Sequence, residues 1–105
     1  DQFFEMTDDV PYMNQVVKVK EEYRDKLPAV THVDGSARVQ TVYKYTVIHD
    51  LLREFEKLSG YPILLNTSFN VKDKTMVLTP KDAVDTFFDT DMDILVMGNY
   101  IMYKN

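Results

Sequence analysis

The residues best suited to chemistry lie in the middle of the sequence, where an apolar run stops. Hydroxyl and amide side chains dominate residues 66–70, directly after the apolar residues 63–65. In an extended strand, Asn66, Ser68 and Asn70 would share one face. Such groups bind phosphate or carbonyl oxygens, and strand ends that lead into loops commonly hold ligands. The pattern indicates a ligand site; the alternative is a hydrogen-bonded strand end that closes the next loop.

A second candidate site lies at residues 32–38, which read His-Val-Asp-Gly-Ser-Ala-Arg. His32 and Asp34 share a face if this stretch is extended. Arg38 follows an Asp-Gly turn signal, and its guanidinium is a planar fork of donors that suits phosphate or carboxylate. The alternatives are a structural His–Asp pair and an internal salt bridge of Arg38.

The acidic residues near the C-terminus do not predict a metal site. Asp82, Asp85 and Asp89 recur at helical spacing, whereas a calcium-binding EF-hand loop places its ligands at alternate positions around a glycine. We therefore expect a solvated helix face there and no metal in this chain. The sequence holds no cysteine, which excludes disulfide scaffolds, thiolate zinc sites and cysteine nucleophiles.

Length and charge limit the partners. The chain has 105 residues and a net charge of −5, which argues against general nucleic-acid binding and leaves room for one small anion in a locally basic pocket. No apolar run approaches the ~20 residues that span a bilayer, and the N-terminus lacks the basic region of a signal peptide. We expect no nucleic-acid or membrane partner and a cytoplasmic location. The first residue is not methionine, so we expect a piece of a longer chain.

Helices and strands must position these residues. The apolar stripe between Thr46 and Gly60 predicts an amphipathic helix, and Thr79-Pro80 predicts the start of a second helix. Strands or extended segments are expected at residues 12–19, 36–43, 63–70 and 75–78, and in a terminal hairpin of residues 93–97 and 100–103. The sum is an α+β fold with a mixed β-sheet and two main helices.

Three stretches together resemble the C-terminal part of the O-carbamoyltransferases, the enzymes of nodulation-factor and antibiotic tailoring. They are residues 32–42, 64–70 and 79–83, and the stretch 95–98 adds to the likeness. The resemblance runs in order along the chain and covers essentially all of it. It implies that residues 1–105 form a single, truncated carbamoyltransferase C-terminal domain.

The resemblance also implies a fold and a reaction. In that family the C-terminal region resembles the threonylcarbamoyl-adenylate synthase (YrdC-like) fold, and a larger N-terminal domain of the Kae1-like, actin-related ATPase type carries a metal. The C-terminal site takes ATP, with Mg²⁺, and carbamoyl phosphate, and makes carbamoyl-adenylate. The N-terminal domain then passes the carbamoyl group to an acceptor hydroxyl. The expected partners of this chain are these small molecules and the missing Kae1-like domain.

The resemblance assigns roles residue by residue. Ser68 and Asn70 match the family's Ser-x-Asn element, and Arg38 matches the arginine of the His-x-Asp-Gly-x-Ala-Arg stretch. We expect these three to be catalytic, because adenylyl transfer depends on positioning and on neutralising phosphate charge. The further residues expected to bind nucleotide or carbamoyl phosphate, which lie in the same two stretches, are Asn66, His32 and Asp34.

The sequence departs from the family pattern in two places. The family's Lys and Arg motif and its N-terminal domain lie upstream of Asp1, and Lys72-Asp73-Lys74 replaces a Gly-Glu-Pro-like turn. We therefore expect the 105 residues alone to fold without catalysing a reaction. One alternative is a non-catalytic interaction module that docks on a Kae1-like partner or self-associates through an exposed sheet edge. Another is a small-ligand binding domain without chemistry.

Overall fold

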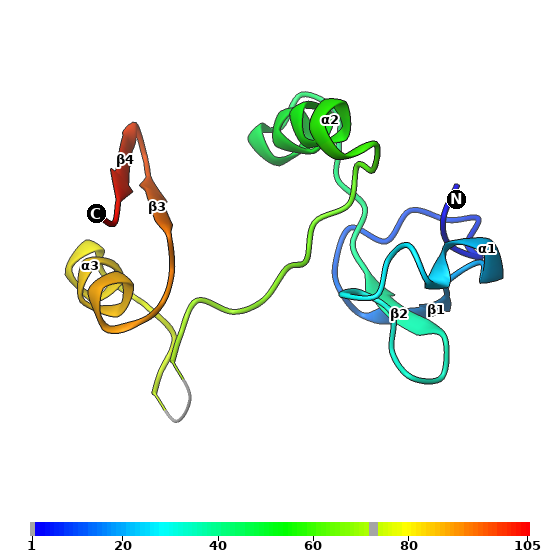
Figure 1. Cartoon of the computed structure of the whole chain (residues 1–105), viewed down its shortest axis with the longest axis horizontal. Coiled ribbons are helices and arrows are strands. Elements are labelled where there is room, and N and C mark those ends of the chain that lie inside the picture. The colour runs from blue at the N-terminus through cyan, green and yellow to red at the C-terminus, as the bar shows by residue number, and fades with distance from the viewer. Residues whose placement is uncertain (1, 72–73) are drawn as a thin grey trace. The chain divides into compact units, whose positions relative to one another are not determined.

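The structure, a computed structural model, describes residues 2–71 and 74–105. These fall into two compact units (Figure 1): residues up to 65 form the first unit, and residues from 66 onward form the second. Each unit has its own small buried core. A turn is expected at residues 72–74, and its first two positions lie outside the described residues.

The first unit is built around an antiparallel pair of strands, β1 (Gln15–Lys18) and β2 (Ser36–Val39). An isolated antiparallel bridge between Phe4 and Val19 adds the N-terminal segment to this pair. Because side chains alternate along a strand, Ala37 and Val39 of β2 both reach the core, whereas Arg38 between them is exposed. The buried apolar cluster of this unit consists of Phe3, Val10, Val19, Leu27, Ala37 and Val39.

Two helices belong to the same unit: the single turn α1 (Glu21–Arg24) and the longer α2 (Val47–Ser59). Thr46 caps α2, because its hydroxyl accepts a hydrogen bond from the backbone N–H of His49 at 3.2 Å. Gly60 ends the helix in the left-handed conformation, with a φ of 82°. The helix predicted between Thr46 and Gly60 is confirmed, with both of its caps.

The second unit consists of α3 (Pro80–Asp89) followed by the hairpin of β3 (Ile94–Met97) and β4 (Tyr100–Tyr103). Thr79 and Asp82 form a capping box: each side chain accepts a hydrogen bond from the backbone N–H of the other. Both the helix start and the terminal hairpin are confirmed. The buried residues of this unit are Ala83, Phe87 and Leu95.

The predicted α+β class is confirmed, but the strands are arranged differently from the expected mixed sheet. Within the described residues they form two separate antiparallel pairs. The strand predicted at residues 63–70 joins neither pair, and Leu64 and Leu65 are exposed. An apolar run becomes a buried strand only where a neighbouring strand completes its hydrogen bonds, and no described strand does so here. The YrdC-like topology stays a prediction.

The helices are short. The longest of those described, α2, has 13 residues. Every helix in the described residues falls short of the length and apolar character needed to cross a membrane.

Candidate functional site

Residues 32–36 form a tight turn that leads into β2. Gly35 has a φ of 77°, and its N–H donates to the carbonyl oxygen of His32 at 2.9 Å. The N–H of His32 in turn donates to the carbonyl oxygen of Ser36 at 2.7 Å. Residues other than glycine rarely adopt such a φ. The Asp-Gly signal in the sequence therefore marks a real turn, and glycine is required in it.

Asp34 is bonded to Ser36 within this turn. Its Oδ1 accepts hydrogen bonds from the hydroxyl of Ser36 at 2.6 Å and from the backbone N–H of Ser36 at 3.0 Å. These two bonds lower the pKa of Asp34, and the nearby Lys18 and His32 lower it further. The side chain of Ser36 is buried while Asp34 and His32 are exposed. The carboxylate of Asp34 therefore orders the turn.

Arg38 lies on β2, opposite Val16 of β1, and its side chain is exposed. Its Nη2 donates to the carbonyl oxygen of Met13 at 2.7 Å. No carboxylate in the described ranges forms a salt bridge with it, so the internal salt bridge considered from the sequence is absent there. One N–H of the fork is anchored, and the others are accessible to an anion.

Two further cations, Lys18 and Arg24, lie at this turn, and no pattern in the sequence distinguishes them from other charged residues. The Nζ of Lys18 donates to the carbonyl oxygen of Asp34 at 2.9 Å. The Nε of Arg24 donates to the carbonyl oxygen of Val19 at 3.0 Å, and its guanidinium lies against Gly35. Arg24 lies in a charged stretch whose composition is typical of a solvated loop. The strand register, which pairs Lys18 with Ser36, places Lys18 beside the turn.

The Ser-x-Asn element lies in the second unit, where its two polar side chains contact each other. The hydroxyl of Ser68 donates to Oδ1 of Asn70 at 2.7 Å. The Nδ2 of Asn70 donates to the carbonyl oxygens of Lys74 at 3.2 Å and Val71 at 3.4 Å. Asn70 therefore binds the backbone of Val71 and Lys74 and orients Ser68, while Asn66 lies exposed at the start of the same stretch.

The predicted site residues divide between the two units. The first unit holds His32, Asp34 and Arg38, and the second holds Asn66, Ser68 and Asn70. Inside the units, the structure brings His32 and Asp34 together at the glycine turn and Ser68 next to Asn70. Their catalytic and binding roles stay predictions.

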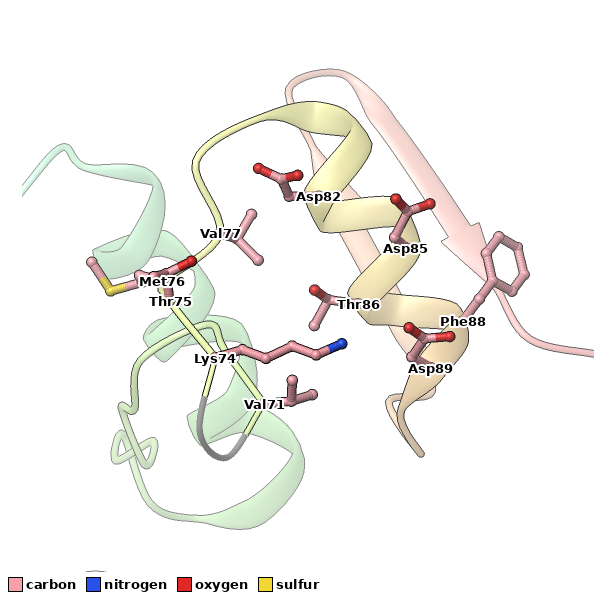
Figure 2. A pocket seen from close by; sticks show the side chains of 10 residues that line it. All are labelled: Val71, Lys74, Thr75, Met76, Val77, Asp82, Asp85, Thr86, Phe88 and Asp89. Atoms are coloured by element: carbon pink, nitrogen blue, oxygen red, sulfur yellow. The ribbon is translucent and has the colours of Figure 1, made fainter.

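An open cavity of about 630 Å³ lies in the second unit, beside α3 (Figure 2). The side chain of Lys74 extends toward α3, which contributes Asp82, Asp85 and Asp89 to the lining. These aspartates are exposed, as the sequence predicted, but the helical spacing alone did not indicate that they border a cavity. In the part of the chain that the structure describes, no three histidine or carboxylate side chains gather as metal ligands.

The glycine turn with the exposed arginine after it, and the paired Ser-x-Asn side chains, lie in two of the three stretches on which the resemblance to the carbamoyltransferases rests. The chain belongs to the carbamoyltransferase C-terminus family, whose family model matches residues 1–104. The resemblance predicted from the sequence is thereby confirmed.

Curated relatives agree with this membership. The chain is 47% identical to nodulation protein NolNO of Sinorhizobium fredii and 44% identical to nodulation protein NolO of Bradyrhizobium diazoefficiens. It is 36% identical to an uncharacterized protein of Methanocaldococcus jannaschii. The three alignments cover 98%, 98% and 99% of this chain but 16%, 20% and 17% of the relatives. The chain therefore spans no more than a fifth of the length of these relatives.

Proposed function

We propose that this chain supplies part of the site at which an ATP-dependent carbamoyltransferase makes carbamoyl-adenylate. The substrates are carbamoyl phosphate and ATP, and the carbamoyl group then passes to an acceptor hydroxyl on another part of the longer protein. Family membership supports carbamoyl transfer as the overall reaction. The observation that carries the assignment of a phosphate site is the exposed Arg38, anchored through one N–H at the carbonyl of Met13.

The proposed reaction requires groups that position the substrates and neutralise phosphate charge. Water releases inorganic phosphate from carbamoyl phosphate and leaves carbamate. A carbamate oxygen forms a bond to the α-phosphorus of ATP, and the bond to pyrophosphate breaks. Negative charge develops on the phosphate oxygens throughout, so the protein contributes mainly by positioning and by neutralising charge. Mg²⁺ accompanies ATP as part of the substrate and shares that neutralisation.

Within this proposal Arg38 is the phosphate clamp. A guanidinium presents parallel N–H donors that match two phosphate oxygens at once. Its contact with Met13 fixes the side chain before the ligand arrives, which reduces the loss of rotamer freedom on binding. His32 and Asp34 belong to the turn that leads to Arg38 through β2, and we expect them to contribute to binding at its edge.

Ser68 and Asn70 orient the adenylate phosphate or the carbamoyl group. Their side chains are adjacent, and a hydroxyl next to a carboxamide offers both donors and acceptors to a carbamoyl group, which itself has both. Asn66 is the third binding residue of this stretch. The 105 residues alone are proposed not to turn over substrate.

The test is the Arg38→Ala substitution in a full-length carbamoyltransferase that carries this chain. We expect pyrophosphate release that depends on both substrates to fall by about 100-fold or more, because a charge-assisted contact made in the transition state is lost. The matched control is Arg53→Ala, since Arg53 is an exposed arginine whose salt-bridge partner within the described residues is Glu56 on α2. It should leave the rate within about threefold.

Two outcomes would contradict the proposal. If Arg38→Ala behaves like Arg53→Ala, the site is not at Arg38, and the non-catalytic interaction module becomes the better interpretation. If the isolated chain binds ATP equally well with and without carbamoyl phosphate, and Ser68→Ala in the full-length enzyme has no effect, a simple nucleotide-binding domain is favoured. Turnover by the isolated 105 residues would overturn the proposed inactivity.

A further inference from the structure

The surface of α2 is divided into three stripes. Residues 100° apart on a helical wheel place Val47, Ile48, Leu51, Phe55 and Leu58 on one continuous apolar stripe. A second stripe, which is half-buried, consists of His49, Leu52 and Glu56. The third stripe is charged. Its Arg53 forms an ion pair with Glu56 of the second stripe at 2.8 Å, and its Lys57 forms one with Glu54 at 2.6 Å.

The apolar stripe of α2 is exposed to solvent, as the charged stripe is. No residue of α2 is buried, and the two ends of the stripe, Val47 and Leu58, are 84% and 88% exposed. The side chains between them are also exposed. An amphipathic helix in a globular protein normally buries its apolar stripe against another surface, so the exposed stripe of α2 lacks the partner that such a stripe usually has.

The area of the apolar stripe indicates what kind of partner covers it. A helix of 13 residues is about 20 Å long and about 10 Å wide, so one face offers ~200 Å² of projected area. A stable dimer needs roughly 800 Å² from each partner. A partner in the same polypeptide needs far less, because covalent linkage supplies a high effective concentration. The patch therefore fits an intramolecular contact better than a second copy.

The longer polypeptides of this family contain a candidate for this contact. The family is that of a carbamoyltransferase C-terminus, and the matched segment is 16% of nodulation protein NolNO and 20% of nodulation protein NolO. Most of the length of such proteins therefore lies outside the matched segment and, for a C-terminal segment, upstream of it.

We infer that the apolar stripe of α2 is an interdomain docking surface, which is covered in a full-length carbamoyltransferase by an apolar face of the preceding part of the chain. The inference rests on family membership and on the exposed stripe. It does not depend on carbamoyl-adenylate chemistry. The docking surface can therefore be refuted while the proposed function holds, and the proposed function can be refuted while the docking surface holds.

The test uses single cysteines, because these 105 residues contain none. Leu51→Cys places a thiol on the apolar stripe, and the matched control Glu54→Cys places one on the charged stripe. Both are made in the isolated chain and in a chimera in which this chain replaces the matching segment of nodulation protein NolNO. Labelling by N-ethylmaleimide is followed on the α2 peptide by mass spectrometry.

In the chimera we expect the Leu51→Cys variant to label about 100-fold more slowly than the Glu54→Cys variant, since a buried site reacts only after local opening. In the isolated chain the two should differ by no more than about threefold. Backbone amide exchange of residues 46–60 in the unsubstituted proteins gives the same comparison without a substitution in the helix. It should be slower in the chimera.

Three results would overturn the inference. The first is equal labelling of both cysteines in the chimera together with unchanged amide exchange of α2. The second is protection of the Leu51→Cys variant in the isolated chain to the same extent as in the chimera. The third is protection that rises with protein concentration, which would identify a second copy as the occupant.

Discussion

The guanidinium of Arg24 lies directly against the backbone of Gly35. A Cβ placed on Gly35 would come within 2.9 Å of both Cζ and Nε of Arg24. The same Nε donates to the carbonyl oxygen of Val19 at 3.0 Å, so the side chain is anchored where it meets the turn. Gly35 is therefore favoured by its positive φ, and a side chain in its place would also have to displace the anchored guanidinium of Arg24.

The first prediction is that Gly35→Ala destabilises the protein more than Gly60→Ala. Both glycines have a positive φ, 77° and 82°, which costs an alanine roughly 1–2 kcal/mol. Only at Gly35 does the new methyl also collide with another side chain, while nothing lies within 4 Å at Gly60. Urea unfolding should show the larger loss for Gly35→Ala. The double substitution Arg24→Ala with Gly35→Ala should recover part of it, and equal losses for the two single variants would refute the account.

The second prediction concerns the titration of Asp34. Its pKa lies below the ordinary value, with the hydrogen bond from the Ser36 hydroxyl as the largest cause. The ionised form is therefore stabilised by folding: this contribution is complete above the unfolded-state pKa and is lost as the pH falls through the lower folded-state pKa. Ser36→Ala should raise the pKa of Asp34, as measured by NMR titration of its carboxyl carbon.

An internal reference for that titration is Asp82, whose pKa is lowered mainly by its hydrogen bond with Thr79. It should titrate at the same pH in the Ser36→Ala variant as in the parent protein. A shift of both aspartates would indicate a general change in structure, and no shift of Asp34 would show that Ser36 does not hold it.

The third prediction tests the start of α3. Thr79→Ala removes the hydroxyl that accepts from the N–H of Asp82 at 3.1 Å, and losing such a cap costs about 1 kcal/mol. Thermal unfolding followed by circular dichroism should show this loss. Thr75→Ala, at an exposed position outside the helix, should be close to neutral. Equal effects of the two substitutions would mean that the capping box does not stabilise α3.

The fourth prediction compares two adjacent phenylalanines on α3. Phe87 is fully buried against the hairpin, whereas Phe88 is 63% exposed. Phe87→Ala should cost about 3–5 kcal/mol, enough to unfold so small a unit, and Phe88→Ala should cost less than about 1 kcal/mol. Amide exchange of β3 and β4 would report this difference. Similar protection of the hairpin in both variants would contradict the packing.

The local features of this fold could be read from the sequence because they depend on neighbours. A cap such as Thr79 bonds to a backbone group three residues away, and Gly60 ends a helix through its own φ. The Asp34-Gly35 turn likewise closes within five residues. For the same reason Ser68 and Asn70 could be expected on one side of the chain. Family membership, too, followed from motifs in linear order.

Burial depended on segments far apart in the sequence. Phe87 and Phe88 are adjacent and equally apolar in the sequence, but only Phe87 packs into the core of the second unit. Leu64 and Leu65 were expected inside a sheet and are exposed, because no described strand pairs with them. The stripe on α2 was correctly predicted as apolar, and only the fold showed that it faces outward.

The sequence by itself determined where the helices begin and end, where the chain turns, and the family to which it belongs. Each of these is encoded by hydrogen bonds, preferred φ values or motifs that span a few residues. Only the tertiary structure decided that Arg24 lies on Gly35, because that contact joins residues eleven positions apart within the segment whose two ends the pairing of β1 with β2 brings together. It also decided which apolar side chains are covered, since burial requires a partner surface that no local pattern supplies.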